Sequence, residues 1–287
     1  MFLRRQVLLL SAAAIALAGS ANPAKAESPF SKLYVFGDSL SDTSNVFLAT
    51  GGEGAGFPYY EGRFSNGPVR VEVLAQALDL PAPEASLLGG SNYAWGAAET
   101  GPGLSFWGTF NVGMQIESFL ADHGGFAGDE LIVVEAGSND LLWSSPYGAG
   151  HIVENLRKHI ADLASAGGRT FLIANSPVGG SDGAKLNQLL AQELPKLEQK
   201  LGVSIIPFDL AGVYQVIRQN PGIFGLTNIT DPACPGCGIG IPEPDAIDTL
   251  VPNPDEYFKW DQIHPTRVVH AIMGQAAAEV VWAEVLP

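Results

Sequence analysis

Short apolar runs alternate along the chain with longer segments in which apolar residues recur every three or four positions. A short apolar run bounded by turn residues is typical of a buried strand, and the longer spacing is typical of a helix with one buried face. The predicted strands are Lys32–Phe36, Asn92–Trp95, Leu131–Glu135, Thr170–Ala174 and Val203–Phe208. The predicted helices are Val69–Leu80, Asn111–Ala121, Ile152–Ala166, Ala184–Leu201, Leu210–Gln219 and a last one over residues 266–282.

This alternation predicts an α/β protein. Parallel strands joined by right-handed crossovers place helices on both faces of one sheet, and we expect about five strands in it. Pro195 lies inside a predicted helix and is expected to break or kink it, because proline removes a backbone hydrogen bond. Residues 220–259 are rich in proline and glycine and are predicted to form a long irregular insertion.

The first 26 residues have the pattern of an export signal. Arg4 and Arg5 precede the apolar run Val7–Leu17, and Ala24-Lys25-Ala26 forms a small-x-small cleavage site. The run is too short for a lasting membrane anchor. We therefore expect a secreted protein, extracellular or periplasmic, without a stable membrane anchor after cleavage near Ala26. Residues 27–287 then form a single domain, which is long enough to bury a full core.

The chain is strongly acidic. It holds 30 Asp and Glu residues against 15 Lys and Arg, for a formal net charge of −15, and the predicted signal removes Arg4, Arg5 and Lys25 without removing an acid. Such a surface repels nucleic-acid phosphates and anionic membranes. We expect no nucleic-acid partner and a monomeric protein.

Cys234 and Cys237 are the two cysteines, in Ala233-Cys234-Pro235-Gly236-Cys237. In an exported protein this spacing predicts a local disulfide. A thioredoxin-like redox pair is the alternative, but the surrounding Pro/Gly-rich loop gives no strand-to-helix context for it. A zinc site is weaker still, because no second pair of ligands lies nearby in the sequence.

The candidate chemistry begins with Ser39, which directly follows the first predicted strand, and with Asp261 and His264 near the C-terminus. A serine hydroxyl becomes a nucleophile when a histidine takes its proton, and a carboxylate usually holds that histidine in one tautomer. Pro265 disfavours helix at the residue before it, so Asp261 and His264 can both face Ser39 from irregular backbone. Taken singly, Ser39 also suits a turn or helix cap, and the other two suit a capped turn.

Gly96 and Asn139 each follow a predicted strand and suit an oxyanion hole. Glycine lets a backbone N–H approach a developing negative charge closely, and the Asn amide is a second donor. Ligands of open parallel sheets bind at the carboxyl ends of the strands, so Ser39, Gly96 and Asn139 are predicted to converge there. The alternative for Asn139-Asp140 is a turn in which Asp140 caps a helix, which we favour for Asp140.

Four motifs in this order resemble the GDSL, or SGNH, hydrolase family. They are Gly37-Asp38-Ser39-Leu40, the glycine Gly96 within Asn92–Ala98, Gly137-x-Asn139-Asp140 and Asp261-x-x-His264, and Gly62–Val69 resembles a further segment of secreted lipase-like members. The Ser39 motif lacks the second glycine of a nucleophile elbow, which counts against an α/β-hydrolase fold. The resemblance covers nearly the whole mature chain. Many members have two glycines where this chain has Gly96-Ala97.

The resemblance implies a flavodoxin-like, three-layer α/β/α sandwich. It also implies Ser39 as the nucleophile, His264 as the base and Asp261 as the residue that orients it. The implied oxyanion hole consists of the Ser39 N–H, the Gly96 N–H and Asn139.

These observations predict an exported esterase or lipase that works through an acyl-serine with no metal or organic cofactor. Its substrate would be a small-molecule, lipid or acylated-carbohydrate ester. A polysaccharide O-deacetylase, a lipid acyltransferase and a non-catalytic surface-binding protein are the alternatives. Several aromatic residues near the motifs line an acyl pocket or belong to the core: Phe57, Tyr59, Tyr60, Trp95, Phe106, Trp107 and Trp143.

Overall fold

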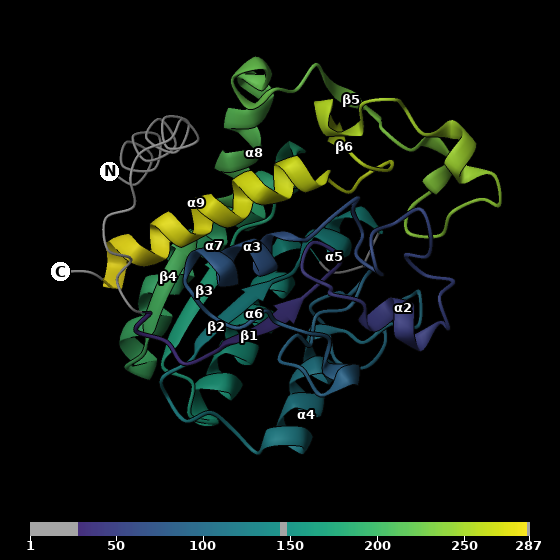
Figure 1. The fold of residues 1–287 in the computed structure, drawn as a ribbon. Helices are drawn as coiled ribbons and strands as arrows, with labels where there is room; N and C mark the ends of the chain where they lie inside the picture. Colours follow the sequence, from purple (N-terminus) through teal and green to yellow (C-terminus); the bar gives the residue numbers. More distant parts are fainter. Residues whose placement is uncertain (1–27, 144–147, 286–287) are drawn as a thin grey trace.

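The computed structural model describes residues 28–143 and 148–285, so the predicted signal segment 1–26 lies outside the described residues. Four parallel strands form the main sheet, in the order β1-β2-β3-β4 (Figure 1). Their bounds are β1 Leu33–Gly37, β2 Leu131–Glu135, β3 Thr170–Ala174 and β4 Ser204–Phe208. All four strands therefore end at the same edge of the sheet.

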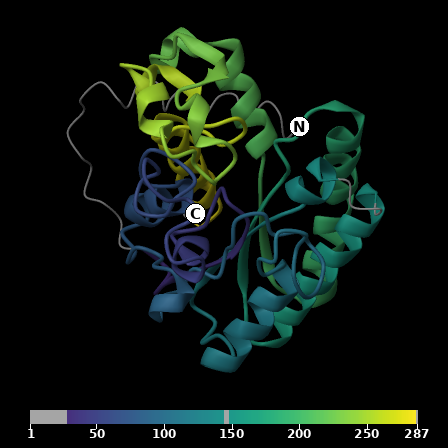
Figure 2. The ribbon, with the colours of Figure 1, turned by 90° about the vertical axis from the view of Figure 1, so that its right-hand side faces the viewer.

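Helices cover both faces of this sheet, as predicted. One face packs against α3 (Arg70–Ala77), α8 (Leu210–Gln219) and α9 (Arg267–Val285), and the other against α4 (Val112–His123), α6 (Ala149–Ser165) and α7 (Gly180–Leu201). Figure 2 shows the strands between these two layers. Side chains alternate along a strand, so Val35 and Val133 enter the first core while Tyr34 and Ile132 enter the second. The three-layer α/β/α sandwich expected from the sequence is confirmed.

The predicted strand at residues 92–95 differs from the expectation. This segment lies beside β1, where the Tyr93 N–H donates to the Val35 carbonyl at 2.8 Å and the Trp95 N–H donates to the Gly37 carbonyl at 3.1 Å. Only one bridge, between Val35 and Asn92, joins the two in the described chain. The Asn92 side chain accepts the Ala94 N–H at 2.9 Å and bends the backbone out of regular strand geometry. The regular sheet thus has four strands, and the fifth expected strand is an extended edge segment.

The proline inside α7 does not end that helix. α7 runs from Gly180 to Leu201 through Pro195. Leu190, Leu194 and Leu197 are buried against the sheet on both sides of the proline, and this packing outweighs the lost hydrogen bond. No helix of the described residues is both long and apolar enough to cross a membrane.

Residues 220–259 were expected to be irregular but contain several short elements. The 3₁₀ turns are η2 Pro221–Phe224, η3 Pro235–Cys237, η4 Ala246–Thr249 and η5 Pro254–Glu256, and the strands β5 Asn228–Pro232 and β6 Tyr257–Lys259 pair in parallel. In Figure 1 this region is the green-to-yellow chain beyond α8. β6 leads directly into the loop that carries Asp261 and His264.

Candidate active site

Ser39 stands in a tight turn directly after β1. The Asp38 carboxyl group accepts the Leu40 N–H at 3.0 Å and fixes this turn. Gly37 is required at the strand end, because a Cβ there would lie 2.5 Å from the Glu135 carbonyl oxygen. Burial, and next the charge of Glu135, raise the pKa of Asp38 well above its ordinary value. The local sequence therefore holds Ser39 at the carboxyl edge of the sheet.

Ser39, His264 and Asp261 form one continuous chain of contacts. His264 Nε2 lies 2.8 Å from Ser39 Oγ, and His264 Nδ1 lies 2.6 Å from Asp261 Oδ2. The second carboxylate oxygen, Asp261 Oδ1, accepts the backbone N–H groups of Ile263 and His264 at 2.9 and 2.7 Å. All three side chains are buried. The structure thus brings together the serine, the histidine and the acid that the sequence singled out, in the geometry of a nucleophile and its base.

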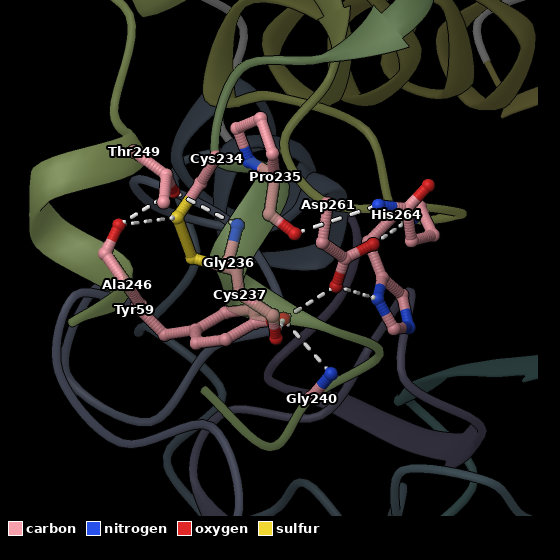
Figure 3. Close-up of a disulfide and its surroundings, with 11 residues drawn as sticks. Tyr59, Cys234, Pro235, Gly236, Cys237, Gly240, Ala246, Thr249, Asp261 and His264 are labelled. Carbon is pink, nitrogen blue, oxygen red and sulfur yellow. Dashed lines mark hydrogen bonds and ion pairs between the residues drawn. A yellow bond between two sulfur atoms is a disulfide. The ribbon is translucent and has the colours of Figure 1, made fainter. Parts of the chain in front are cut away.

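Tyr59 adds a fourth member that the sequence did not identify. Its hydroxyl lies 2.6 Å from Asp261 Oδ2 and 2.9 Å from the Cys237 carbonyl, and it accepts the Gly240 N–H at 2.8 Å (Figure 3). The hydroxyl has one proton, and the charged, nearer carboxylate is the stronger acceptor. Burial, and next the charge of Asp261, raise the pKa of Tyr59 far above its ordinary value, so it remains a neutral donor.

Cys234 and Cys237 are joined in a disulfide and are fully buried. Their loop is tied to the active-site loop, because the Cys234 N–H donates to the Trp260 carbonyl at 2.7 Å. The pair lies on a 3₁₀ turn rather than at the start of a helix after a strand, which is the setting that a thioredoxin-like motif needs. Across the described residues no group of three His, Cys, Asp or Glu side chains is arranged to hold a metal ion.

Asp42 gathers backbone donors behind the nucleophile. It accepts the N–H groups of Ser44, Asn45, Val46 and Gly96 at 2.6 to 3.2 Å. Burial outweighs these four hydrogen bonds and raises the pKa of Asp42 to about 6. Gly96, expected from the sequence to be an oxyanion donor, lines the same cavity as Ser39, but its N–H donates to Asp42 at 2.9 Å.

Ala97, the residue after Gly96, presents the unused N–H. Its φ of 61° lies in the left-handed region, where glycine is normally favoured. No hydrogen bond to the N–H of Ala97 or of Ser39 occurs among the described residues. Both residues line the same cavity. The sequence signal that could have identified Ala97 is its position, since it stands where many family members carry the second glycine.

Asn139 faces this cavity from α5 (Ser138–Leu142), directly after β2. One amide hydrogen donates to the Ala98 carbonyl at 2.9 Å, and the amide oxygen accepts the Trp143 indole N–H at 3.0 Å. The orientation of the amide is thereby fixed. The sequence suggested that Asp140 caps the helix, but it does not. Asp140 instead accepts the Thr100 N–H and hydroxyl at 3.0 and 2.6 Å. It thus holds the 97–100 loop beside Asn139.

A cavity of about 430 Å³ opens in front of Ser39. Its polar wall contains Ser39, His264 and Asn139 together with Thr50, Glu53 and Thr109, and the backbone of Gly96 and Ala97 also lines it. The apolar wall is formed by Val46, Phe64, Trp107, Trp143, Ile239, Ile241 and Ile263. Of the aromatic residues considered in the sequence, Trp107 and Trp143 therefore line the cavity. Trp95 packs on Phe110 with ring centroids 4.5 Å apart, and Tyr59 lies behind the acid.

Residues 33–277 match the GDSL-like Lipase/Acylhydrolase family. The chain belongs to this family. It is therefore a carboxylic ester hydrolase of the GDSL type, which agrees with the expectation from its four motifs.

Two relatives illustrate the family likeness, and one solved structure illustrates the fold. A GDSL esterase/lipase of Arabidopsis thaliana is 30% identical over 85% of this chain and 80% of its own length. The phosphatidylcholine-sterol acyltransferase of Aeromonas hydrophila is 26% identical over 87% of this chain and 89% of its own length. A family two carbohydrate esterase of Clostridium thermocellum has a TM-score of 0.51 at 12% identity, covering 89% of this chain and 64% of that one. At that identity the structural match shows the fold alone.

Proposed function

We propose that this GDSL hydrolase cleaves carboxylic esters through an acyl-serine formed on Ser39. The observation that carries the proposal is the unbroken set of contacts from Asp261 through His264 to Ser39, at 2.6 and 2.8 Å, beside an apolar cavity. Neutral His264 takes the hydroxyl proton at Nε2 while Ser39 Oγ attacks the ester carbon. Asp261 holds the Nδ1 proton and stabilises the imidazolium that forms.

The oxyanion is stabilised by three donors in this proposal. They are the N–H groups of Ser39 and Ala97 and the second amide hydrogen of Asn139. Ala97 takes the place expected for Gly96, because the Gly96 N–H is already donated to Asp42. Collapse of the intermediate breaks the ester C–O bond, and His264 returns its proton to the departing alcohol. Water then attacks the acyl-serine while His264 takes its proton. His264 returns this proton to Ser39 Oγ as the carboxylic acid leaves.

The cavity supports an acyl chain as the group held beside Ser39. Its walls are mostly aliphatic and aromatic, and its volume of about 430 Å³ is within the range of small-molecule sites.

We propose that the enzyme is exported after cleavage at Ala26, which N-terminal sequencing of the mature protein checks directly. A mature protein that begins at Met1 would contradict export.

A set of p-nitrophenyl esters of increasing chain length, run beside acetylated xylan and phosphatidylcholine, tests the substrate class. A serine-directed phosphonate should inactivate the enzyme and label Ser39, as located by peptide mass spectrometry. Activity that survives phosphonate treatment, or a label on another residue, would overturn the acyl-serine. Release of acetate from acetylated xylan without turnover of the long-chain p-nitrophenyl esters or of phosphatidylcholine would favour the deacetylase instead.

Acyl transfer to an alcohol is a second candidate, favoured by the likeness to the Aeromonas acyltransferase. The acyl-serine is common to both reactions, so only the acceptor differs. Product analysis in the presence of a sterol or a primary alcohol separates them: transfer yields a new ester, whereas hydrolysis yields only free acid.

A further inference from the structure

Exposed apolar side chains occur on the segments of the chain that border the catalytic cavity. We call this group the apolar rim, and it consists of Leu104, Phe106, Trp107, Leu142, Ile239 and Ile241. Phe106 is 85% exposed and Ile241 is 63% exposed. Large apolar side chains are common singly on protein surfaces, but a contiguous group marks an interaction site.

The rim is continuous with the cavity. Trp107, Ile239 and Ile241 line the same space as Ser39. The Phe106 ring packs against Trp107 with centroids 5.6 Å apart, and Trp107 lies 6.0 Å from Trp143, which also lines the cavity. Leu142 precedes Trp143 on α5. A surface resting on the rim would therefore lie directly over the entrance to the nucleophile.

The rim contrasts in charge with the rest of the chain. Residues 102–110 and 238–242, which supply most of it, contain no Asp, Glu, Lys or Arg, although the chain as a whole has a formal net charge of −15. Among the described residues that line the adjoining cavity, Glu53 is acidic and none is Lys or Arg, so this face has no basic side chain to attract an anionic surface. It suits the headgroup and acyl boundary of a lipid surface with no net charge, where Trp, Phe and Ile side chains insert.

We propose that the apolar rim docks the enzyme onto a zwitterionic phospholipid surface and places the cavity over its ester groups. This inference rests on the proposed function, since it supplies the route by which a lipid ester reaches Ser39. A second copy of the chain is a poorer occupant, because it would close the mouth of the catalytic cavity. A lipid surface covers the same side chains and delivers substrate into the cavity.

The test uses two side chains of the rim that do not line the cavity. Leu104→Ser/Phe106→Ser is compared with Leu88→Ser/Ile223→Ser, a control pair of exposed side chains (64% and 66%) on η1 (Ser86–Leu88) and η2, neither of which lines the cavity. Both pairs are placed in a Ser39→Ala background, and binding to phosphatidylcholine vesicles is measured by flotation. We expect the rim pair to weaken binding by at least about tenfold, because two large apolar side chains lose their burial in lipid, while the control pair binds as the parent.

The same pairs in active enzyme give the second readout. Hydrolysis of soluble p-nitrophenyl acetate should be unchanged in both, while hydrolysis of phosphatidylcholine vesicles should fall in the rim pair alone. Equal vesicle binding by all variants, with folding checked by circular dichroism, would overturn the docking proposal. So would a shift of the rim pair from dimer to monomer in light scattering without any vesicle binding by the parent. Vesicle binding by a parent that hydrolyses no ester would support docking and refute the proposed function.

Discussion

The Tyr59 hydroxyl lies 2.6 Å from Asp261 Oδ2, the same oxygen that faces His264 Nδ1. Asp261 therefore receives donors from two sides, and its position depends on a residue that is far away in the sequence. The same hydroxyl lies 2.9 Å from the carbonyl of Cys237, so the disulfide loop and the catalytic acid share one contact (Figure 3). We infer that Tyr59 is a positioning residue for Asp261.

Replacing Tyr59 with Phe removes this hydrogen bond and keeps the ring. We expect kcat to fall by at least roughly tenfold with little change in KM, because a charge-assisted hydrogen bond of about 1.5–3 kcal/mol is lost from the acid and none from the substrate. Steady-state kinetics on a soluble ester provide the measurement. In an Asp261→Asn background the same change should have a smaller effect, since the charge it supports is gone. A full tenfold effect in both backgrounds would mean that Tyr59 acts independently of Asp261.

The disulfide bond itself should matter less to activity than the Tyr59 contact. Cys234→Ala/Cys237→Ala is expected to fold and to lose less activity than Tyr59→Phe, because neither cysteine side chain lines the catalytic cavity. The loss of stability should be below the ~3 kcal/mol estimated for a longer, 15-residue loop. Thermal unfolding and kcat are measured for the double cysteine variant and the wild type, and the loss of kcat is compared with that of Tyr59→Phe. Complete inactivation of a folded double variant would revive a redox role.

Much of the fold could be predicted from the sequence because its strands are continuous apolar runs buried on both faces. The runs around Val35, Val133 and Leu172 indicate strands by themselves. The 92–95 segment could not be distinguished from a strand, because its departure depends on the Asn92 side chain, which accepts the Ala94 N–H at 2.9 Å and donates to the distant Ser41 carbonyl at 2.6 Å. The continuity of α7 through Pro195 likewise depends on tertiary packing, which outweighs local propensity.

In the site, the motifs identified the residues that carry reactive side chains. They did not identify the residues that contribute a backbone N–H group or that hold a reactive side chain in position. Ala97 has no reactive group, and apart from its position after Gly96 it is its φ and the N–H without a partner among the described residues that reveal it. Tyr59 could not be told from a core aromatic until its hydroxyl was placed beside Asp261. Asp42 lies two residues after the first motif, and the four N–H groups it accepts include one from a separate loop.

Ser39→Ala and His264→Ala should each lower kcat by at least about 10⁴-fold and leave the fold intact. The two side chains act as a unit, so the double variant should be no worse than the worse single one. Asp261→Asn should be milder, because His264 retains part of its function as a base without its orienting acid. Kinetics with circular dichroism measure all three. Losses that add in the double variant would show that Ser39 and His264 act separately.

Asn139→Ala should lower kcat by roughly 10²–10³-fold, about 2.7–4 kcal/mol, if its free amide hydrogen stabilises the oxyanion. KM should change little, because the charge exists only in the transition state. Asn175, which follows β3 and donates to Asp209 at 2.7 Å, supplies a matched control at the same sheet edge. Asn175→Ala should leave kcat unchanged. A lowered melting temperature with normal kcat in Asn139→Ala would instead indicate a purely structural residue.

The buried His270 is expected to lower the free energy of unfolding in acid. It is fully buried on α9, its Nδ1 accepts the Arg70 N–H at 3.0 Å, and its Nε2 has no partner among the described residues. Burial, followed by the charges of Arg70 and His264, lowers the pKa of His270 well below 6.5. The unfolded chain therefore binds a proton below pH 6.5 that the folded chain does not, so stability from this site falls as the pH falls, by up to about 1.4 kcal/mol per pH unit.

Other buried groups oppose this trend, so the comparison must be made against a variant. Asp42, whose pKa is raised to about 6, gives the folded state extra stability as the pH falls through that value. His270→Asn keeps an acceptor for the Arg70 N–H and removes the titration. Urea unfolding at about pH 7.5 and about pH 5 should show the wild type losing stability relative to this variant as the pH falls. Only the wild type has a histidine at this position that the unfolded chain protonates and the folded chain does not. His123→Asn, at the exposed end of α4, is the control. A wild-type-to-variant difference that is the same at both pH values would show that His270 does not contribute to the acid sensitivity of the fold.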